Sequence, residues 1–204
     1  MDSLKIPDDG RDLIHDCENC EALCCASLKL DSRLFPILED KPAGVPCYNL
    51  EVRITQNIFK CKIHDQLKDN WKICAGYSCY GAGQEVSRFF SELGFSLETH
   101  KSKHISQFEY NIRKQNLETA FIVLVALFEL LKDIEIKHGV MAYALAKKSI
   151  EIEMELFSLE IESLDLSMHI EKRNEWLRVF VKKITYTLKY NKINIEDLIV
   201  DLFS

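Results

Sequence analysis

The chain has 204 residues, enough for one large core or two small ones, and its 47% apolar content with only 7 Gly and 4 Pro is typical of a folded, helix-rich protein. The net charge of −6 provides no basic surface for phosphate, so we expect no nucleic acid among its partners. Segment 1–12 lacks the pattern of a secretory signal and the longest apolar run, 120–131, is too short to span a bilayer, so the sequence predicts a cytoplasmic protein that makes no membrane contact.

The first part of the chain differs in composition from the rest. All eight cysteines lie between positions 17 and 79, and all four prolines lie before position 47. We expect residues 1–83 to form a small, irregular, cysteine-rich metal-binding module, with short helical turns near 20–27 and 64–69. A module of this size has little apolar mass, so something other than a hydrophobic core must stabilise it.

Residues 84–204 are predicted to form an α-helical domain. Apolar spacing predicts a helix over 84–93 ended by Gly94, a long helix over about 106–137 followed by Gly139, a helix along a seam from Ile150 to Met168, a helix over about 171–190, and a short last helix capped by Asn194. Short connections favour a bundle, so the fold class is mainly α. The residues expected along the apolar faces of these helices are Val86, Phe89, Phe90, Leu93, Phe108, Ile112, Leu117, Phe121, Leu124, Phe128, Leu131, Ile150, Met154, Phe157, Ile161, Leu164, Met168, Leu177, Phe180, Ile184, Leu188, Leu198, Ile199 and Leu202.

The cysteines indicate metal binding. Thiols stay reduced in the cytoplasm, so eight clustered cysteines predict thiolate ligands rather than disulfides. A Cys-x-x-Cys step lets two sulfurs meet on one ion, and thiolate suits zinc or an iron–sulfur cluster. Neighbouring side chains usually diverge, so one of Cys24 and Cys25 is expected to serve a second ion or to stay free. The predicted ligands are Cys17, Cys20, Cys24, Cys25, Cys47, Cys61, Cys74 and Cys79.

Other polar residues are weaker candidates. His64, three residues after Cys61, is more often a supporting residue than a ligand at such a position, and His15 is weaker still. The pair His100 and His104 lacks a third ligand. Turn 81–83 lacks the Lys-Ser/Thr of a phosphate loop and is better explained as a turn that positions Cys79 beside the next helix. The glutamates between 151 and 162 and the basic stretch 172–183 are interpreted as solvated helix faces.

The order of the cysteines resembles the YkgJ-like family of zinc- or iron-chelate-binding proteins, which carries a Cys-x-x-Cys-x-x-Cys-Cys cluster. The likeness continues through Cys47-Tyr-Asn-Leu50, Cys61-Lys-Ile-His64 and the closing pair Cys74 and Cys79. It is closer to the cysteine-rich N-terminal module of bacterial pentapeptide-repeat proteins, which shares segments 40–44 and 77–84. The match spans about residues 15–85, although the step from Cys20 to Cys24 is one residue longer here and no pentapeptide repeat follows. The resemblance implies metal binding.

Several functions are compatible with these features. We expect a zinc-stabilised module, or alternatively one with an iron–sulfur cluster, whose loops 41–45 and 71–80 present a surface to a protein partner. A different possibility is an enzyme or enzyme subunit that uses the metal or cluster in redox or protein-modification chemistry, as in some cluster-bearing relatives. A third is a metal carrier or sensor. The sequence predicts no catalytic residues.

Overall fold

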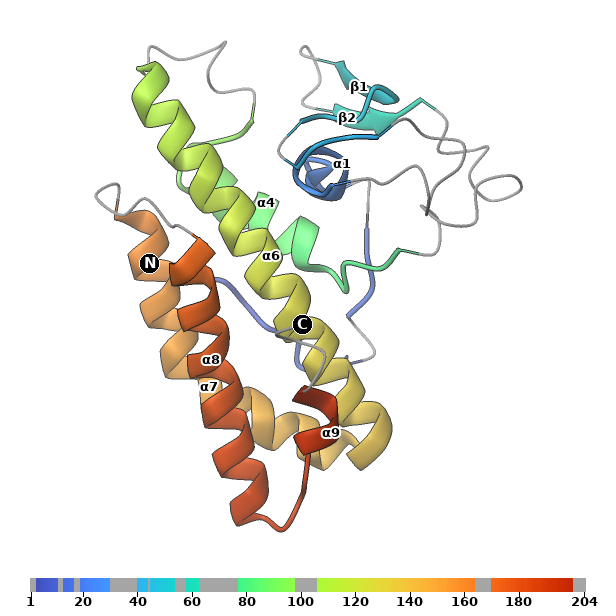
Figure 1. Ribbon diagram of the computed structural model, residues 1–204, viewed down its shortest axis with the longest axis vertical. Coiled ribbons are helices and arrows are strands. Elements are labelled where there is room, and N and C mark those ends of the chain that lie inside the picture. Colours follow the sequence, from blue (N-terminus) through green and yellow to red (C-terminus); the bar gives the residue numbers. More distant parts are fainter. Residues whose placement is uncertain are drawn as a thin grey trace.

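The computed structural model describes residues 3–10, 13–16, 19–29, 40–43, 45–53, 58–62, 77–97, 106–163 and 170–199. Within them the protein is mainly helical, as the sequence predicts. The elements are α1 (Leu23–Ser27), β1 (Leu50–Arg53), β2 (Ile58–Cys61), α4 (Ala82–Glu92), α6 (Gln107–His138), α7 (Val140–Glu162), α8 (Ile170–Tyr190) and α9 (Glu196–Ile199). Figure 1 shows α6 crossing the molecule, with α7 and α8 along one side and α1 and the β hairpin on the other.

Helix α6 is the centre of the fold and packs against α1, α4, α7, α8 and α9. Its start is fixed by Ser106, whose hydroxyl accepts a hydrogen bond from the Glu109 N–H at 3.1 Å. Most of the predicted apolar face is buried, including Phe121, but Phe108 is 75% exposed. The prediction for Phe108 was therefore wrong, because the first turn of α6 extends past the elements that cover the rest of the helix.

Helix α7 begins immediately after Gly139, ten residues before the start of the predicted seam. Gly139 has φ +86°, a conformation that glycine adopts at little cost, and it serves both as the C-cap of α6 and as the N-cap of α7. The predicted seam is buried as far as Ile161. The helix then ends at Glu162, where Ser163 adopts an extended conformation. The last two seam residues, Leu164 and Met168, lie outside the described residues.

Helix α8 packs on α7 through an aromatic cluster of Phe157, Trp176 and Phe180, with ring centroids 5.2–5.8 Å apart. Its predicted inward residues are all buried. The final short helix α9 begins as predicted, with the Asn194 side chain accepting a hydrogen bond from the Glu196 N–H at 3.1 Å. Leu202 lies outside the described residues. No helix in the described part of the chain is long and apolar enough to cross a membrane.

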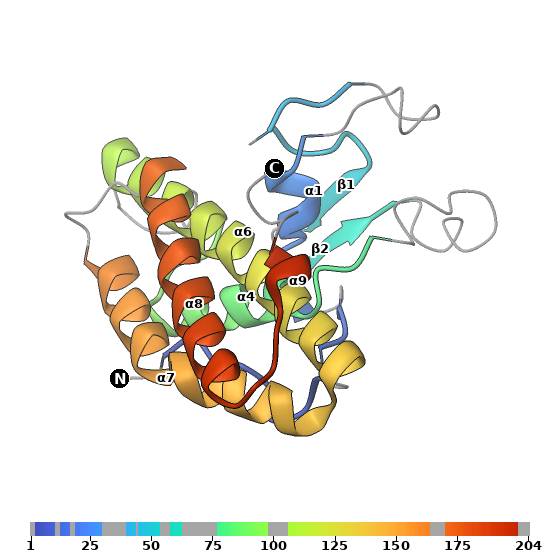
Figure 2. The same ribbon diagram turned by 60° about the horizontal axis from the view of Figure 1, so that its bottom comes forward.

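An N-terminal strap, residues 3–10, lies along the helices. The Leu4 N–H donates to the Ser158 hydroxyl at 3.0 Å, and the Tyr143 hydroxyl donates to the Pro7 carbonyl at 2.7 Å. Figure 2 shows this blue segment passing close to α7. Leu4 is buried in the same core as the helices, so the first residues of the chain contribute to the apolar core.

The cysteine-rich region contains regular structure that the sequence analysis did not predict. Strands β1 and β2 pair antiparallel, with Leu50 opposite Cys61 and Arg53 opposite Ile58. The helical turn expected near 20–27 is present as α1, whereas the turn expected over 64–69 lies outside the described residues. Whether residues 1–83 and 84–204 are separate domains stays a prediction.

Candidate metal centre

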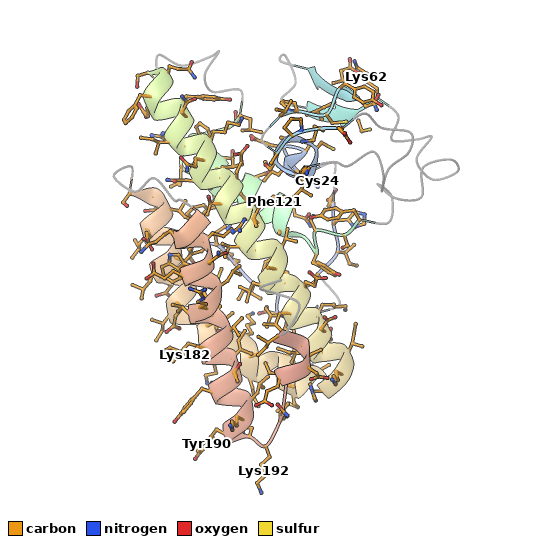
Figure 3. All side chains as sticks on the ribbon, in the orientation of Figure 1. Cys24, Lys62, Phe121, Lys182, Tyr190 and Lys192 are labelled. Atoms are coloured by element: carbon orange, nitrogen blue, oxygen red, sulfur yellow. The ribbon has the colours of Figure 1, made fainter. Side chains whose placement is uncertain are left out.

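Six of the eight predicted ligands fall among the described residues, on or next to α1, the β hairpin and the start of α4. Cys17 and Cys74 lie outside them, as does His64. The six thiols carry no disulfide: Cys20, Cys24, Cys25, Cys47, Cys61 and Cys79. Segments distant in the sequence thus bring cysteines to one part of the molecule, and Figure 3 shows Cys24 next to α6 and the start of α4.

Cys79 lies where α4 begins. Burial raises the pKa of this thiol, and hydrogen bonds from the backbone N–H groups of Gly83 and Gly81 act in the opposite direction. The N-terminus of a helix carries partial positive charge, which favours a thiolate over a thiol. Gly81 has φ +87°, so glycine suits the turn that points the chain from Cys79 into α4. The prediction that turn 81–83 positions Cys79 beside the helix is confirmed.

Cys20 lies against the same turn of α4. A Cβ atom on Gly83 would stand 2.6 Å from the Cys20 sulfur and 3.6 Å from the Cys79 sulfur, so both sulfurs border the bare backbone of one glycine. Burial raises the pKa of Cys20 to about 12, while hydrogen bonds from the Leu23 N–H and the Ser87 hydroxyl favour its thiolate. The negative charges of Cys24 and Cys79 raise it further, which places three thiols within electrostatic reach of one another.

Cys24 and Cys25 do not diverge. Their sulfur atoms are 3.9 Å apart, so these two neighbouring side chains point the same way. That one of them serves a second ion or stays free remains a prediction. Both belong to the single turn of α1, which follows Ala22 in a left-handed conformation. The shared hydrogen bond with Cys25 and burial both raise the pKa of Cys24. Cys24 therefore connects the thiols at α4 with those nearer the hairpin.

The hairpin brings two more cysteines towards Cys25. The Cys47 N–H donates to the Cys25 carbonyl at 2.9 Å, and the Leu50 N–H donates to the Cys47 carbonyl at 2.9 Å. Because Leu50 pairs with Cys61, the antiparallel register places Cys61 close to the chain around Cys47. The backbone around Cys25, Cys47 and Cys61 is thus joined by hydrogen bonds, next to the Cys24–Cys25 pair.

A buried lysine lies in the loop that precedes Cys47. Lys41 is 6% exposed, and its ammonium donates to the carbonyls of Pro42, at 3.3 Å, and of Val45. Burial lowers its pKa, and the negative charges of Cys47 and Cys25 act against that shift. The sequence predicted Lys41 only as part of a surface loop, because no pattern distinguishes a buried lysine from an exposed one in an irregular segment.

The described thiols lie near one another without forming a complete metal site. Within the described ranges, no three His, Cys, Asp or Glu side chains are placed closely enough to hold one ion together. The residues nevertheless fit a thiolate-bound metal in two respects. Their sulfurs are soft donors supported by N–H and hydroxyl groups, and Gly83 leaves room for two of them against the helix.

The weaker candidates are placed elsewhere. His15 is exposed, and His100 and His104 lie outside the described residues. The acidic face of α7 and the basic face of α8 are partly paired with each other. Lys183 forms a salt bridge with Glu153 at 2.7 Å, and Lys172 forms one with Glu160 at 2.9 Å. These charges hold α8 against α7.

Two further residues of the site were not predicted. Ser87 is buried, and its hydroxyl accepts the Glu21 N–H at 2.9 Å while donating to Cys20. The position of Ser87 on the apolar face of the predicted helix 84–93 could have indicated that its hydroxyl has a buried hydrogen-bond partner. Tyr77 is the second: burial raises the pKa of its hydroxyl, and the charges of Cys24 and Cys79 raise it further.

Comparisons with known proteins give one relative and no family. No protein-family model matches the chain, and no solved structure matches it significantly. An uncharacterised Bacillus subtilis protein, YybG, is 38% identical over 82 residues, which cover 40% of this chain. The matched segment is 27% of that relative, so the chain corresponds to a small part of its length.

Proposed function

We propose that this chain binds metal through its cysteines, and that the metal stabilises a small recognition module carried on a helical platform. The observation that carries the proposal is the meeting of Cys20 and Cys79 on either side of Gly83, within electrostatic reach of Cys24. Cys20 and Cys24 lie just before and within α1, and Cys79 lies just before α4, more than 50 positions later, so a local sequence pattern alone does not explain their proximity.

The surroundings of the sulfurs support a thiolate role. Burial raises the pKa of Cys20 and Cys79, so without metal these thiols stay neutral. A bound metal ion displaces the protons, and its binding energy then contributes to folding. Backbone N–H groups donate to the Cys79 sulfur and a hydroxyl donates to the Cys20 sulfur, which is the kind of outer contact that orients metal ligands.

We infer zinc as the metal, with an iron–sulfur cluster as the alternative. Two thiolates on one tetrahedral zinc ion, with bonds of about 2.3 Å, stand roughly 3.8 Å apart. The sulfurs of Cys24 and Cys25 are 3.9 Å apart, close to that separation. If a cluster is present instead, redox or protein-modification chemistry becomes the better proposal. Free thiols among the described cysteines also agree with a reducing compartment such as the cytoplasm.

The recognition role is supported by exposed apolar side chains around the thiols. Val45 is 46% exposed, Tyr48 55% and Tyr77 37%, and each is within three residues of a predicted ligand. Aromatic residues exposed on a rigid support are frequent at protein interfaces. A metal that fixes the loops carrying these side chains would keep them in one arrangement for a protein partner.

The deciding experiment is metal and acid-labile sulfide analysis, with an absorption spectrum, on protein purified without oxygen. Three results would support the proposal: zinc in stoichiometric amount, no visible absorption, and unfolding of the cysteine-rich module when a chelator removes the metal. A brown protein with sulfide would favour the cluster and an enzymatic role. An apo form that stays fully folded and releases metal readily would favour a carrier or sensor, and a protein without metal or sulfide would overturn the proposal.

A further inference from the structure

Helix α7 carries a row of apolar side chains on one exposed face, which we call the α7 stripe. Its members are Met141, Leu145, Ile152, Leu156 and Leu159. Leu145 is half-buried, and the other four are 50–74% exposed. Single exposed apolar residues are ordinary on a protein surface, but a row of them along roughly five helical turns is typical of a surface that another molecule covers.

The α7 stripe runs between two elements that cover other parts of the helix. On one side α8 packs against α7, with Lys183 in a salt bridge to Glu153. On the other side lies the N-terminal strap, where the Leu4 N–H donates to the Ser158 hydroxyl. Figure 2 shows α7 along the outer edge of the helices. The stripe is therefore the part of α7 that faces outward between the strap and α8.

The arrangement of the stripe is symmetric about Ile152. Leu145 lies seven residues before it and Leu159 seven residues after it. If two α7 helices lie antiparallel about a twofold axis at this point, Ile152 meets its own copy and Leu145 meets Leu159 of the second copy. A surface that is complementary to itself in this way fits a second copy of the chain better than an unrelated protein.

The charges beside the stripe have the same symmetry. Lys148 and Glu155 are seven residues apart, about two turns, so they follow one edge of the stripe. Both are exposed, and neither has a salt-bridge partner among the residues that the structure describes. In the antiparallel pair this edge of each helix faces the same edge of the other. Since Lys148 is four residues before Ile152 and Glu155 three residues after it, opposite charges meet twice.

We propose that the α7 stripe is the contact surface of a homodimer, in which two α7 helices pair antiparallel about Ile152 and Lys148 of each copy binds Glu155 of the other. This inference is independent of the proposed metal site. Figure 1 shows α7 and the β hairpin on opposite sides of α6, so the dimer leaves both cysteine-rich regions accessible. Two such regions in one assembly bind a partner that has two sites more tightly than one region does.

The first test is the association of the full chain, measured by sedimentation velocity over a range of concentrations with a reductant present. We expect the parent chain to form a dimer that dissociates on dilution. Ile152→Glu places two carboxylates together at the twofold axis and should raise the dissociation constant at least about 100-fold. Phe108→Glu is the matched control, because Phe108 is an equally exposed apolar residue on α6, and it should change the constant less than about threefold.

The second test exchanges the charges. Lys148→Glu and Glu155→Lys each turn two attractive contacts into repulsive ones, so each variant alone should dimerise about tenfold more weakly. An equimolar mixture of K148E and E155K should recover the affinity of the parent, because every contact along the edge of the mixed dimer again joins opposite charges. All four positions are exposed, and circular dichroism confirms that each variant is folded.

Three results would overturn the proposal. A parent chain that is monomeric at every concentration would leave the stripe to a different protein. A dimer that I152E leaves intact would use another surface. A mixture of K148E and E155K that associates no better than either variant alone would exclude the antiparallel pairing.

Discussion

The sulfur of Cys20 lies 2.6 Å from the point where a Cβ atom on Gly83 would stand. This distance is shorter than any that a real Cβ atom accepts, so a side chain at position 83 must displace the thiol or the start of α4. Gly83 is in the first turn of a helix, where alanine is normally preferred by up to about 1 kcal/mol. Because the Cys20 sulfur lies so close, replacing Gly83 by alanine should destabilise the protein, whereas the same change elsewhere in a helix usually stabilises it.

Gly83→Ala is expected to destabilise the protein by about 1–3 kcal/mol, the usual cost of overpacking a well-filled interior. The free energy of unfolding from urea titration measures it. Ser91→Ala, at an exposed position of the same helix, is the control and should change stability little. A Gly83→Ala variant as stable as the parent would mean that Cys20 is not held against α4.

Ser87→Ala should cost about 1–2 kcal/mol, because it leaves the Glu21 N–H without its acceptor and Cys20 without its hydroxyl donor. The same change should weaken metal binding several-fold, since the hydroxyl favours the thiolate. Urea denaturation and chelator competition measure the two effects. If the variant matches Ser91→Ala in both, the hydroxyl has no role at the site.

The pH dependence of thiol reactivity follows from the pKa of Cys20, raised by burial from 9.0 to about 12. At pH 8 in the folded, metal-free protein, its thiolate fraction is about a thousandfold below that of an ordinary thiol, because reactivity depends on the thiolate. Alkylation followed by peptide mass spectrometry should find Cys20 protected when folded and reactive in urea. Rapid labelling of Cys20 in the folded chain would contradict its burial.

The same pKa shift determines a trend in stability. The folded state keeps Cys20 protonated to higher pH than the unfolded state does, so its contribution is complete below pH 9 and is lost as the pH rises towards 12. In metal-free protein the free energy of unfolding should fall more steeply above pH 9 in the parent than in Cys20→Ala. Equal slopes would show that Cys20 does not titrate differently in the two states.

Metal removal should act locally. The helices from α4 to α9 have a continuous apolar core, whereas the hairpin adjoins the predicted metal ligands Cys47 and Cys61. After chelation we expect amide hydrogen exchange to rise in β1 and β2 and to stay slow in α6. Uniform loosening of both regions would mean that they unfold as one cooperative unit.

Phe157→Ala tests the packing of α7 on α8. Phe157 is fully buried between Trp176 and Phe180, so its truncation should cost about 3–5 kcal/mol. Leu156→Ala, one residue earlier and half exposed, is the matched control and should cost much less. The midpoints of urea unfolding give the comparison, and similar losses for the two variants would contradict the assigned helix face.

Sequence patterns predicted the helical half well because its signals are local. The seam of α8, the Ser106 start of α6 and the Asn194 cap depend on residues within a few positions of one another. The start of α7 was missed, since Gly139 looks like the end of one helix and gives no sign that the next begins at once. The hairpin was missed because its two four-residue strands are short, and pairing Leu50 with Cys61 requires contact across a loop.

The candidate site divides in the same way. The eight cysteines could be predicted as metal ligands from their clustering in the sequence. The residues that contact their sulfurs in the structure could not be predicted. Which sulfur lies beside Gly83 depends on a contact between segments more than 60 positions apart, for which the sequence has no local signal. Burial of Lys41 depends on the path of a loop, for which the sequence has no periodic signal.

The N-terminal strap has a consequence for how the chain folds during synthesis. The Leu4 N–H binds the Ser158 hydroxyl, a partner 154 residues later, so this contact cannot form until position 158 has been translated. At about 5–20 residues per second, Leu4 is synthesised about 8–30 seconds before its partner Ser158. The cysteine-bearing segments that follow the strap emerge in the same interval, so the nascent chain exposes its thiols well before the helices that cover them exist.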